Sequence, residues 1–139
     1  MERTIQVLVI DDDRLIRALL RDILENAGLE VLEAAGGRPG LRYLRAARCD
    51  LVITDLLMPD VDGVAVIREV TREYPDVKII ALSGGGYTLS AGTALEVAQR
   101  SGALRTLIKP VYRDQLLATI RELFPDWHPP QEENPDVPA

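Results

Sequence analysis

Residues 50–63 have the sequence DLVITDLLMPDVDG. The first half is a short run of apolar and β-branched residues that stops at Asp55, which predicts a buried strand with a carboxylate at its carboxyl end. The second half is rich in Pro, Asp and Gly, which favour turns. A helix is predicted after this turn, with four residues facing inward at helical spacing: Val64, Ile67, Val70 and Thr71.

The same alternation of strand and helix patterns extends in both directions. Apolar runs predict four further strands, at residues 5–10, 29–33, 77–83 and 103–108. Helical spacing of apolar residues predicts helices at residues 15–24, 39–47, 64–71, 89–101 and 113–124. Asp13 is placed to cap the first helix and Gly28 to end it. Three polar residues of that helix are expected to face away from the core: Arg17, Arg21 and Asp22.

Five strands that alternate with five helices predict an α/β domain, with a parallel sheet covered on both faces. The chain has 139 residues and a net charge of −6. We assign residues 1–124 to this domain and residues 125–139, which hold four acids and no Lys or Arg, to an acidic, Pro-rich disordered tail. The charge of the domain is nearly balanced, without the excess of Lys and Arg that is typical of proteins that bind nucleic acid directly. No apolar run is long enough to span a membrane, so we expect a cytoplasmic protein without membrane insertion.

Polar side chains stand at the ends of four predicted strands. Asp11 and Asp12 follow the first strand, and the third, fourth and fifth strands lead to Asp55, Ser83 and Lys109. Ligands of open parallel sheets bind at the carboxyl ends of the strands, so these five groups are expected to converge. Any one of them alone is as easily a helix cap, a turn residue or a solvated charge. Their occurrence at successive strand ends favours a joint functional site.

Three neighbouring carboxylates repel one another unless a cation lies between them. Oxygen ligands without nearby His or Cys favour Mg²⁺, or Mn²⁺, over zinc. One carboxylate would then remain as a nucleophile toward phosphorus. The metal, the hydroxyl and the ammonium would neutralise the oxygens of the transferred phosphoryl group. The residues alone therefore indicate phosphoryl transfer to an aspartate.

Four segments of the chain occur together in an order typical of one family. They are residues 10–13 (IDDD), 55–63 (DLLMPDVDG), 80–84 (IALSG) and 109–110 (KP). Over about residues 4–124 the chain resembles the receiver domains of two-component response regulators. The resemblance implies a stand-alone receiver with a flavodoxin-like doubly wound (βα)5 fold and strand order 2-1-3-4-5. It also implies a phosphorelay protein that takes a phosphoryl group from a histidine kinase or phosphotransfer protein and does not turn over external substrates.

The resemblance assigns a chemical role to each residue of the site. Asp55 is the implied phosphoacceptor, and Ser83 and Lys109 are the implied groups that meet the phosphoryl oxygens. The implied Mg²⁺ ligands are three carboxylates and one backbone carbonyl: Asp11, Asp12, Asp55 and Leu57.

The resemblance also implies roles for the backbone and the loops. The backbone amides of Leu56 and Gly84 are expected to bind the phosphoryl group. Structural roles fall to three residues, the last of which is expected to follow a cis peptide bond: Pro59, Gly63 and Pro110. An unknown downstream protein is expected to bind the face formed by the fourth helix, the fifth strand and the fifth helix.

The chain departs from the family's pattern at three places. Thr106 stands where receivers commonly carry a Tyr or Phe, so a rotating aromatic ring is not available to report phosphorylation. Residues 84–93 predict a longer loop before the fourth helix, which we expect to influence the choice of partner. Leu57 and Gly85, which flank the acidic pocket, carry no polar side chain to orient a hydrolytic water.

Three other functions remain as alternatives. A phosphorylation-independent adaptor on the receiver fold leaves the acidic pocket unexplained. A phosphohydrolase of the haloacid dehalogenase type would carry its nucleophile in an Asp-x-Asp-x-Thr/Val pattern after the first strand, which residues 11–15 (DDDRL) do not match. A flavodoxin-like cofactor binder would need a phosphate-binding loop where this chain has three aspartates.

Overall fold

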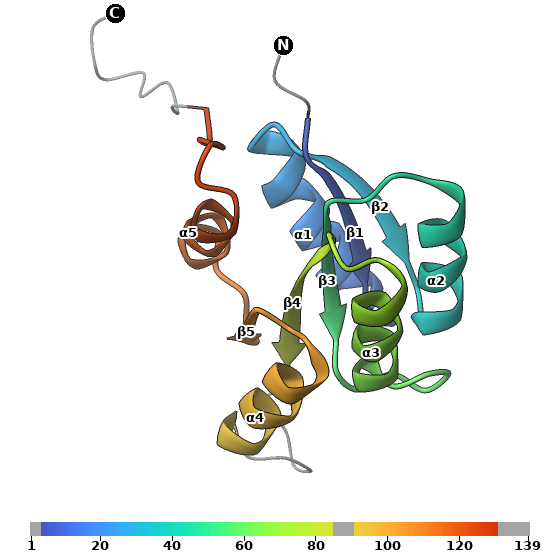
Figure 1. Ribbon diagram of the computed structural model, residues 1–139. Helices are drawn as coiled ribbons and strands as arrows, with labels where there is room; N and C mark the ends of the chain where they lie inside the picture. Colours follow the sequence, from blue (N-terminus) through green and yellow to red (C-terminus); the bar gives the residue numbers. More distant parts are fainter. Residues whose placement is uncertain (1–3, 85–90, 131–139) are drawn as a thin grey trace, which may run out of the picture.

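The computed structural model of the chain describes residues 4–84 and 91–130. Within this part, five parallel strands form one sheet in the order β2-β1-β3-β4-β5, with a helix after each strand (Figure 1). The strands are β1 (Gln6–Ile10), β2 (Glu30–Ala34), β3 (Leu51–Asp55), β4 (Lys78–Ser83) and β5 (Arg105–Ile108). The helices are α1 (Arg14–Asn26), α2 (Gly37–Ala46), α3 (Gly63–Glu73), α4 (Ala91–Ser101) and α5 (Arg113–Leu123). The predicted doubly wound architecture and strand order are confirmed.

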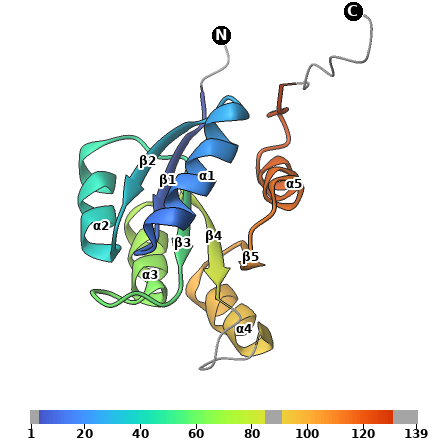
Figure 2. The same cartoon turned by 180° about the vertical axis from the view of Figure 1, so that it is seen from behind.

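Helices cover both faces of the sheet, because successive side chains of a strand point to opposite sides. Val7 and Val9 of β1 pack in a cluster with residues of α1 and α5. Leu8 and Ile10 of the same strand pack on the other face with residues of α2, α3 and α4. Figure 1 shows α2 and α3 toward the viewer, and Figure 2, from behind, shows α1 in front of β1. The core thus consists of two apolar layers separated by the sheet.

The predicted start and end of α1 are confirmed. Asp13 accepts a hydrogen bond through Oδ1 from Leu15 N at 2.9 Å, which satisfies one free amide of the first turn. Gly28 follows the helix with a φ of +86°, in the left-handed region that favours glycine. The Asp13 cap fixes the start of α1 and therefore the path of the chain from the carboxyl end of β1, next to the predicted site.

The inward face of α3 differs in part from the prediction. Ile67 and Val70 are buried as expected, but Val64 is only partly buried and Thr71 is exposed. Val66 takes the inward position instead. The helix begins at Gly63, so its buried stripe follows positions 63, 66, 67 and 70, which a period of 3.6 residues accommodates.

Pro125 to Pro130 continue beyond α5, and Trp127 packs against the cluster that contains α1 and α5. Trp127 N donates to Phe124 O at 2.9 Å. The Lys78 ammonium lies 4.8 Å from the centroid of the Phe124 ring and donates to Leu123 O. Residues 131–139 lie outside the described residues, and a disordered tail there stays a prediction. Among the helices of the described part, none has the length and apolar character needed to cross a lipid bilayer.

Gly63 closes the loop between β3 and α3 against the backbone of the strand end. Gly63 N donates to Leu56 O at 2.9 Å. A Cβ atom at position 63 would overlap the carbonyl oxygen of Asp55 and lie 2.6 Å from Leu56 Cα. Only a glycine therefore lets α3 start this close to Asp55, which gives a physical reason for a structural role of Gly63.

We expect Gly63→Ala to destabilise the protein by about 1–3 kcal/mol, because a side chain forced against backbone atoms displaces the loop. Helix propensity alone predicts the opposite sign, since alanine is the better helix former. Urea unfolding followed by circular dichroism measures the difference. Gly84→Ala is the control, since a Cβ there has no neighbour within 4 Å in the part of the chain that the structure describes. Equal or greater stability of Gly63→Ala would contradict the steric account.

Candidate functional site

The carboxyl ends of the strands bring the predicted side chains together. Lys109, which follows β5, places its Nζ 2.9 Å from Asp11 Oδ2 and 3.3 Å from Asp55 Oδ2. Oxygens of Asp11, Asp12 and Asp55 all lie within 4.8 Å of one another. Ser83 ends β4 and is buried beside them in the sheet. The five residues predicted to converge do lie on the same edge, since neighbouring parallel strands end in register there.

Asp11 is buried, and both its side chain and its backbone make polar contacts. Its side chain is fully buried, and Asp13 N donates to its Oδ1 at 2.9 Å. Its Oδ2 faces the Lys109 ammonium. Its backbone N–H donates to Ala34 O of β2 at 3.2 Å. Asp12, by contrast, is exposed, so the pair presents one fixed and one solvent-accessible carboxylate.

Lys109 is placed by the backbone on both sides of it. Its N–H donates to Ser83 O at 2.8 Å, which ties the start of the β5–α5 loop to the end of β4. The peptide bond between Lys109 and Pro110 is cis, as predicted. The side chain is 18% exposed and bridges the two buried carboxylates. This position lets one ammonium balance the charges of both acids.

The charges of the site shift the pKa values of Asp55 and Lys109. Burial raises the pKa of Asp55, and the negative charge of Asp11 adds to the rise, while the Lys109 ammonium opposes it. Burial alone would lower the pKa of Lys109, but the hydrogen bond to Asp11 and the charges of Asp55 and Asp11 outweigh it. The net result is a raised pKa for Lys109, so it stays charged at neutral pH.

The donor set fits a hard divalent cation. It consists of carboxylate oxygens, one of them on exposed Asp12, and it includes no His or Cys among the described residues. Such a set suits Mg²⁺ or Mn²⁺. Asp11, Asp12 and Asp55 supply more negative charge than the single Lys109 ammonium balances. The residues present therefore fit the metal that the sequence predicts.

One backbone assignment needs correction. The Leu56 N–H, predicted to bind the phosphoryl group, donates to Leu82 O at 3.1 Å. It continues the ladder between β3 and β4 and is not free, because Asp55 pairs with Leu82 in the register of these strands. The amide that faces the carboxylate is that of Leu57, whose N lies 3.5 Å from Asp55 Oδ1.

The other predicted residues lie around this center. Gly84 is exposed at the end of β4, and a Cβ there would meet no atom of the described residues within 4 Å. Pro59 is exposed in the β3–α3 loop. Thr106 pairs with Ala81 in the sheet, and its buried Oγ1 has no hydrogen-bond partner among the described residues. Gly85 and most of the predicted loop over residues 84–93 lie outside the described residues.

Asp60, an aspartate expected to act as a helix cap or a turn residue, caps a helix that lies far from it in the sequence. Its carboxylate accepts hydrogen bonds from Gly37 N and Arg38 N, both at 3.1 Å. It thus caps α2, whose own N-cap residue, Gly36, has no side chain to do so. The sequence signal for this contact is the pair Gly36-Gly37, which stands just before the helix predicted from residue 39 and offers no side chain to cap it. The loop that follows Asp55 is therefore tied to a neighbouring helix.

Comparison with known families assigns the chain. The family model described as the response regulator receiver domain matches residues 7–121. The chain belongs to this family. Receiver domains interact with histidine kinases and phosphotransfer proteins, and they are generally not substrate-turnover enzymes.

Several receivers are similar to this chain over most of its length. The chemotaxis protein CheY of Thermotoga maritima is 29% identical over 119 residues, which cover 85% of this chain and 96% of that protein. The transcriptional regulatory protein ZraR of Escherichia coli is 35% identical over 135 residues, or 97% of this chain. This chain spans only 30% of ZraR and 25% of the regulator NtrC of Azospirillum brasilense.

Solved structures of receivers superpose on the whole fold. A CheY-like receiver from Methanospirillum hungatei gives a TM-score of 0.81 at 28% identity, covering 89% of this chain and 96% of that one. The chemotaxis protein CheY4 of Vibrio cholerae gives a TM-score of 0.78 at 30% identity, covering 86% and 98%. The arrangement of strands and helices is therefore that of CheY-like receivers.

The cap of α2 predicts a pH-dependent difference in stability. The backbone N–H groups of Arg38, Val61 and Gly37 hold the pKa of Asp60 below its ordinary value of 3.8. A lowered folded-state pKa stabilises the fold above pH 3.8, and this contribution is lost as the pH falls through the folded-state pKa. Asp60→Asn keeps one acceptor oxygen and no charge. We expect it to be less stable than the wild type at pH 7, with the difference shrinking below pH 3.8.

Urea unfolding at pH 7 and pH 3 measures the free energy of unfolding of the wild type and of Asp60→Asn, and hence the difference between them at each pH. A difference of the same size at both values would contradict a role for the Asp60 charge.

Proposed function

We propose that this chain accepts a phosphoryl group on Asp55 from a histidine kinase or a phosphotransfer protein, with Mg²⁺, and thereby changes its binding to a downstream protein. The observation that carries the proposal is the Lys109 ammonium between Asp11 Oδ2 and Asp55 Oδ2. It leaves Asp55 beside a fixed cation at the carboxyl edge of the sheet. Asp12, the exposed acid of the three, then completes an oxygen cluster for the metal.

The residues of the site supply the steps of the transfer. An oxygen of Asp55 forms the new bond to phosphorus, while the bond from phosphorus to the donor's imidazole nitrogen breaks and the imidazole leaves with its electron pair. Asp11, Asp12, Asp55 and the carbonyl of Leu57 would hold Mg²⁺, which neutralises phosphoryl oxygens when bound. Lys109 stabilises a second oxygen, and the hydroxyl of Ser83 donates to a third.

Two backbone amides complete the cradle for the phosphoryl group. Leu57 N, which faces Asp55 Oδ1, takes the place of the Leu56 amide, which is engaged in the sheet. Gly84 N follows Ser83 directly, and the open space at Gly84 leaves room for the incoming group. Burial raises the pKa of Asp55 and the Lys109 ammonium opposes this rise, so Lys109 favours the carboxylate form that would attack phosphorus.

The proposed output surface is the face formed by α4, β5 and α5. Leu104, Ile108 and Tyr112 are exposed at or next to β5, which supports binding of another protein there. Thr106 lies in β5 between these residues and cannot act as a rotating ring. We propose that Ser83 instead draws its loop toward the phosphoryl group and changes the population of conformations of this face.

The test is phosphorylation by a small donor. The protein is incubated with acetyl phosphate and Mg²⁺, and its intact mass is recorded beside Asp55→Asn. We expect one added phosphoryl group that depends on the metal and is missing in the variant. Asp62→Asn is the matched control, since Asp62 lies in the same loop but caps α3 through Ala65 N at 2.8 Å.

Two results would contradict the proposal. Absence of any adduct, with the donor unconsumed, would favour a phosphorylation-independent adaptor. Consumption of the donor over many turnovers without an adduct would favour a phosphohydrolase.

A further inference from the structure

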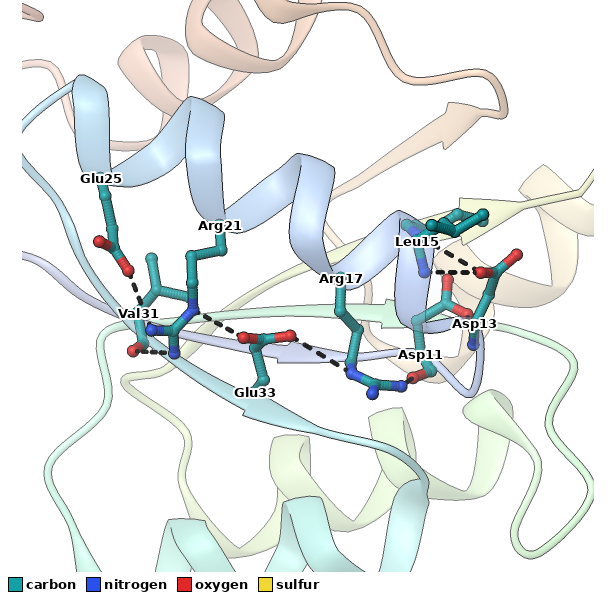
Figure 3. A network of polar contacts seen from close by, with 9 residues as sticks. Asp11, Asp13, Leu15, Arg17, Arg21, Glu25, Val31 and Glu33 are labelled. Atoms are coloured by element: carbon teal, nitrogen blue, oxygen red, sulfur yellow. Dashed lines mark hydrogen bonds and ion pairs between the residues drawn. The ribbon is translucent and has the colours of Figure 1, made fainter.

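A row of charges joins α1 to β2 beside the loop of Asp11, Asp12 and Asp13, which we call the acidic loop (Figure 3). Glu33 of β2 lies between two arginines of α1: its Oε1 is 3.4 Å from Arg17 Nε and its Oε2 is 2.6 Å from Arg21 Nε. Arg21 also pairs with Glu25 at 3.0 Å and donates to Val31 O at 3.0 Å. Both arginines had been expected to face away from the core. They lie along β2 instead, because β2 presents an acid to them.

Arg17 is the member of this row that reaches the functional site. Its Nη1 donates to the backbone carbonyl of Asp11 at 2.8 Å, while its Nε faces Glu33. The Arg17 side chain is only 15% exposed. A guanidinium held at two points in a fixed plane loses little freedom on making the second contact. Arg17 therefore connects β2 rigidly to the first acid of the loop.

The Asp11 carbonyl belongs to the peptide group that joins Asp11 to Asp12. A peptide group is planar, so a fixed carbonyl also fixes the direction in which the chain enters Asp12. The Asp11 N–H is bonded to Ala34 O, and Asp13 caps α1 through Leu15 N. Removal of Arg17 would take away the hydrogen-bond donor of the Asp11 carbonyl and leave the other bonds of this turn in place. The orientation of the exposed Asp12 carboxylate thus depends on Arg17.

The charge of the row suits a site for a cation. An arginine beside a metal site weakens cation binding by repulsion unless an acid neutralises it. Glu33 supplies that charge for Arg17, and Glu25 supplies it for Arg21. The row therefore holds the acidic loop without adding net positive charge next to it.

We propose that Arg17 is a positioning residue for the metal site, which aligns Asp12 with Asp11 and Asp55 through the Asp11 carbonyl, and that Glu33 holds Arg17 in place. This inference rests on the proposed function, since it concerns the metal that the acidic cluster would hold. Two simpler roles predict different results. If Arg17 acted only through its charge, its removal would tighten the binding of metal. If Arg17 only joined α1 to β2, its removal would change the stability of the protein alone.

The test is the affinity of the free protein for Mn²⁺, measured by the loss of the electron paramagnetic resonance signal of the aqueous ion. We expect Arg17→Met to lower the affinity roughly tenfold, the size of effect typical of residues that orient metal ligands. Arg21→Met is the matched control. This substitution removes an equal charge, two contacts of α1 with β2 (to Glu33 and Val31) and one within α1 (to Glu25). None of these contacts involves Asp11.

We expect Arg21→Met to bind Mn²⁺ with nearly the affinity of the wild type, and we expect thermal unfolding to show that this variant is less stable than the wild type. Equal or tighter Mn²⁺ binding by Arg17→Met would overturn the inference. An equal loss of affinity in both variants would also overturn it, because general loosening of α1 would then explain the result.

A double-mutant cycle tests the part assigned to Glu33. If Glu33 acts through Arg17, Glu33→Gln lowers the affinity in the wild-type background and has no further effect in Arg17→Met. The same loss in both backgrounds would contradict this order of action. The wild type and Asp12→Asn separate the inference from the proposed function. If the wild type does not bind Mn²⁺, or if Asp12→Asn binds it as tightly as the wild type, the proposed metal site itself fails. Binding by the wild type that is lost in Asp12→Asn but unchanged in Arg17→Met refutes only the role of Arg17.

Discussion

The site depends on one ammonium group shared by two buried carboxylates. Asp11 and Asp55 are each 6% exposed or less, and side by side in a poorly solvated edge they would repel each other strongly. Lys109 lies within 3.3 Å of both, and its side chain is 18% exposed. The two carboxylates can therefore lie side by side because β1, β3 and β5 all end at the same edge of the sheet, which places Lys109 next to both. The strand order, with β3 and β4 between β1 and β5, is what brings the lysine of the last strand within reach of the acid of the first.

The remaining features of the edge hold these groups at the required distance. Gly63 lets α3 begin directly against Asp55, and Lys109 N fastens the β5–α5 loop to Ser83 O. Asp60 and Arg17 act farther out, and each ties a loop that carries a proposed metal ligand to a neighbouring element. The acidic loop is joined to β2, and the loop after Asp55 is joined to α2. A cation bound between the two loops would thus meet ligands already held from both sides.

The strands and the five converging residues could be predicted because they depend on local patterns. Each strand is a short apolar run, and a polar residue at its end must lie at the edge where parallel strands present ligands. The contacts that the sequence did not reveal are those made between elements. The engagement of Leu56 N with Leu82 O follows from strand register, and the capping of α2 by Asp60 spans 22 residues of sequence. Arg17 looks like a solvated residue on a helical wheel, and only the position of Glu33 on the adjacent strand turns it inward.

The central claim is that Asp55, and no other acid of this edge, receives the phosphoryl group. The most direct measurement is reduction of the phosphorylated protein with borohydride, which converts an aspartyl phosphate to homoserine, followed by peptide mapping. The account predicts homoserine at position 55 after treatment with acetyl phosphate and Mg²⁺, and aspartate at positions 11, 12, 60 and 62. Homoserine at one of those positions, or intact aspartate at position 55 in a protein that carries the added mass, would contradict it.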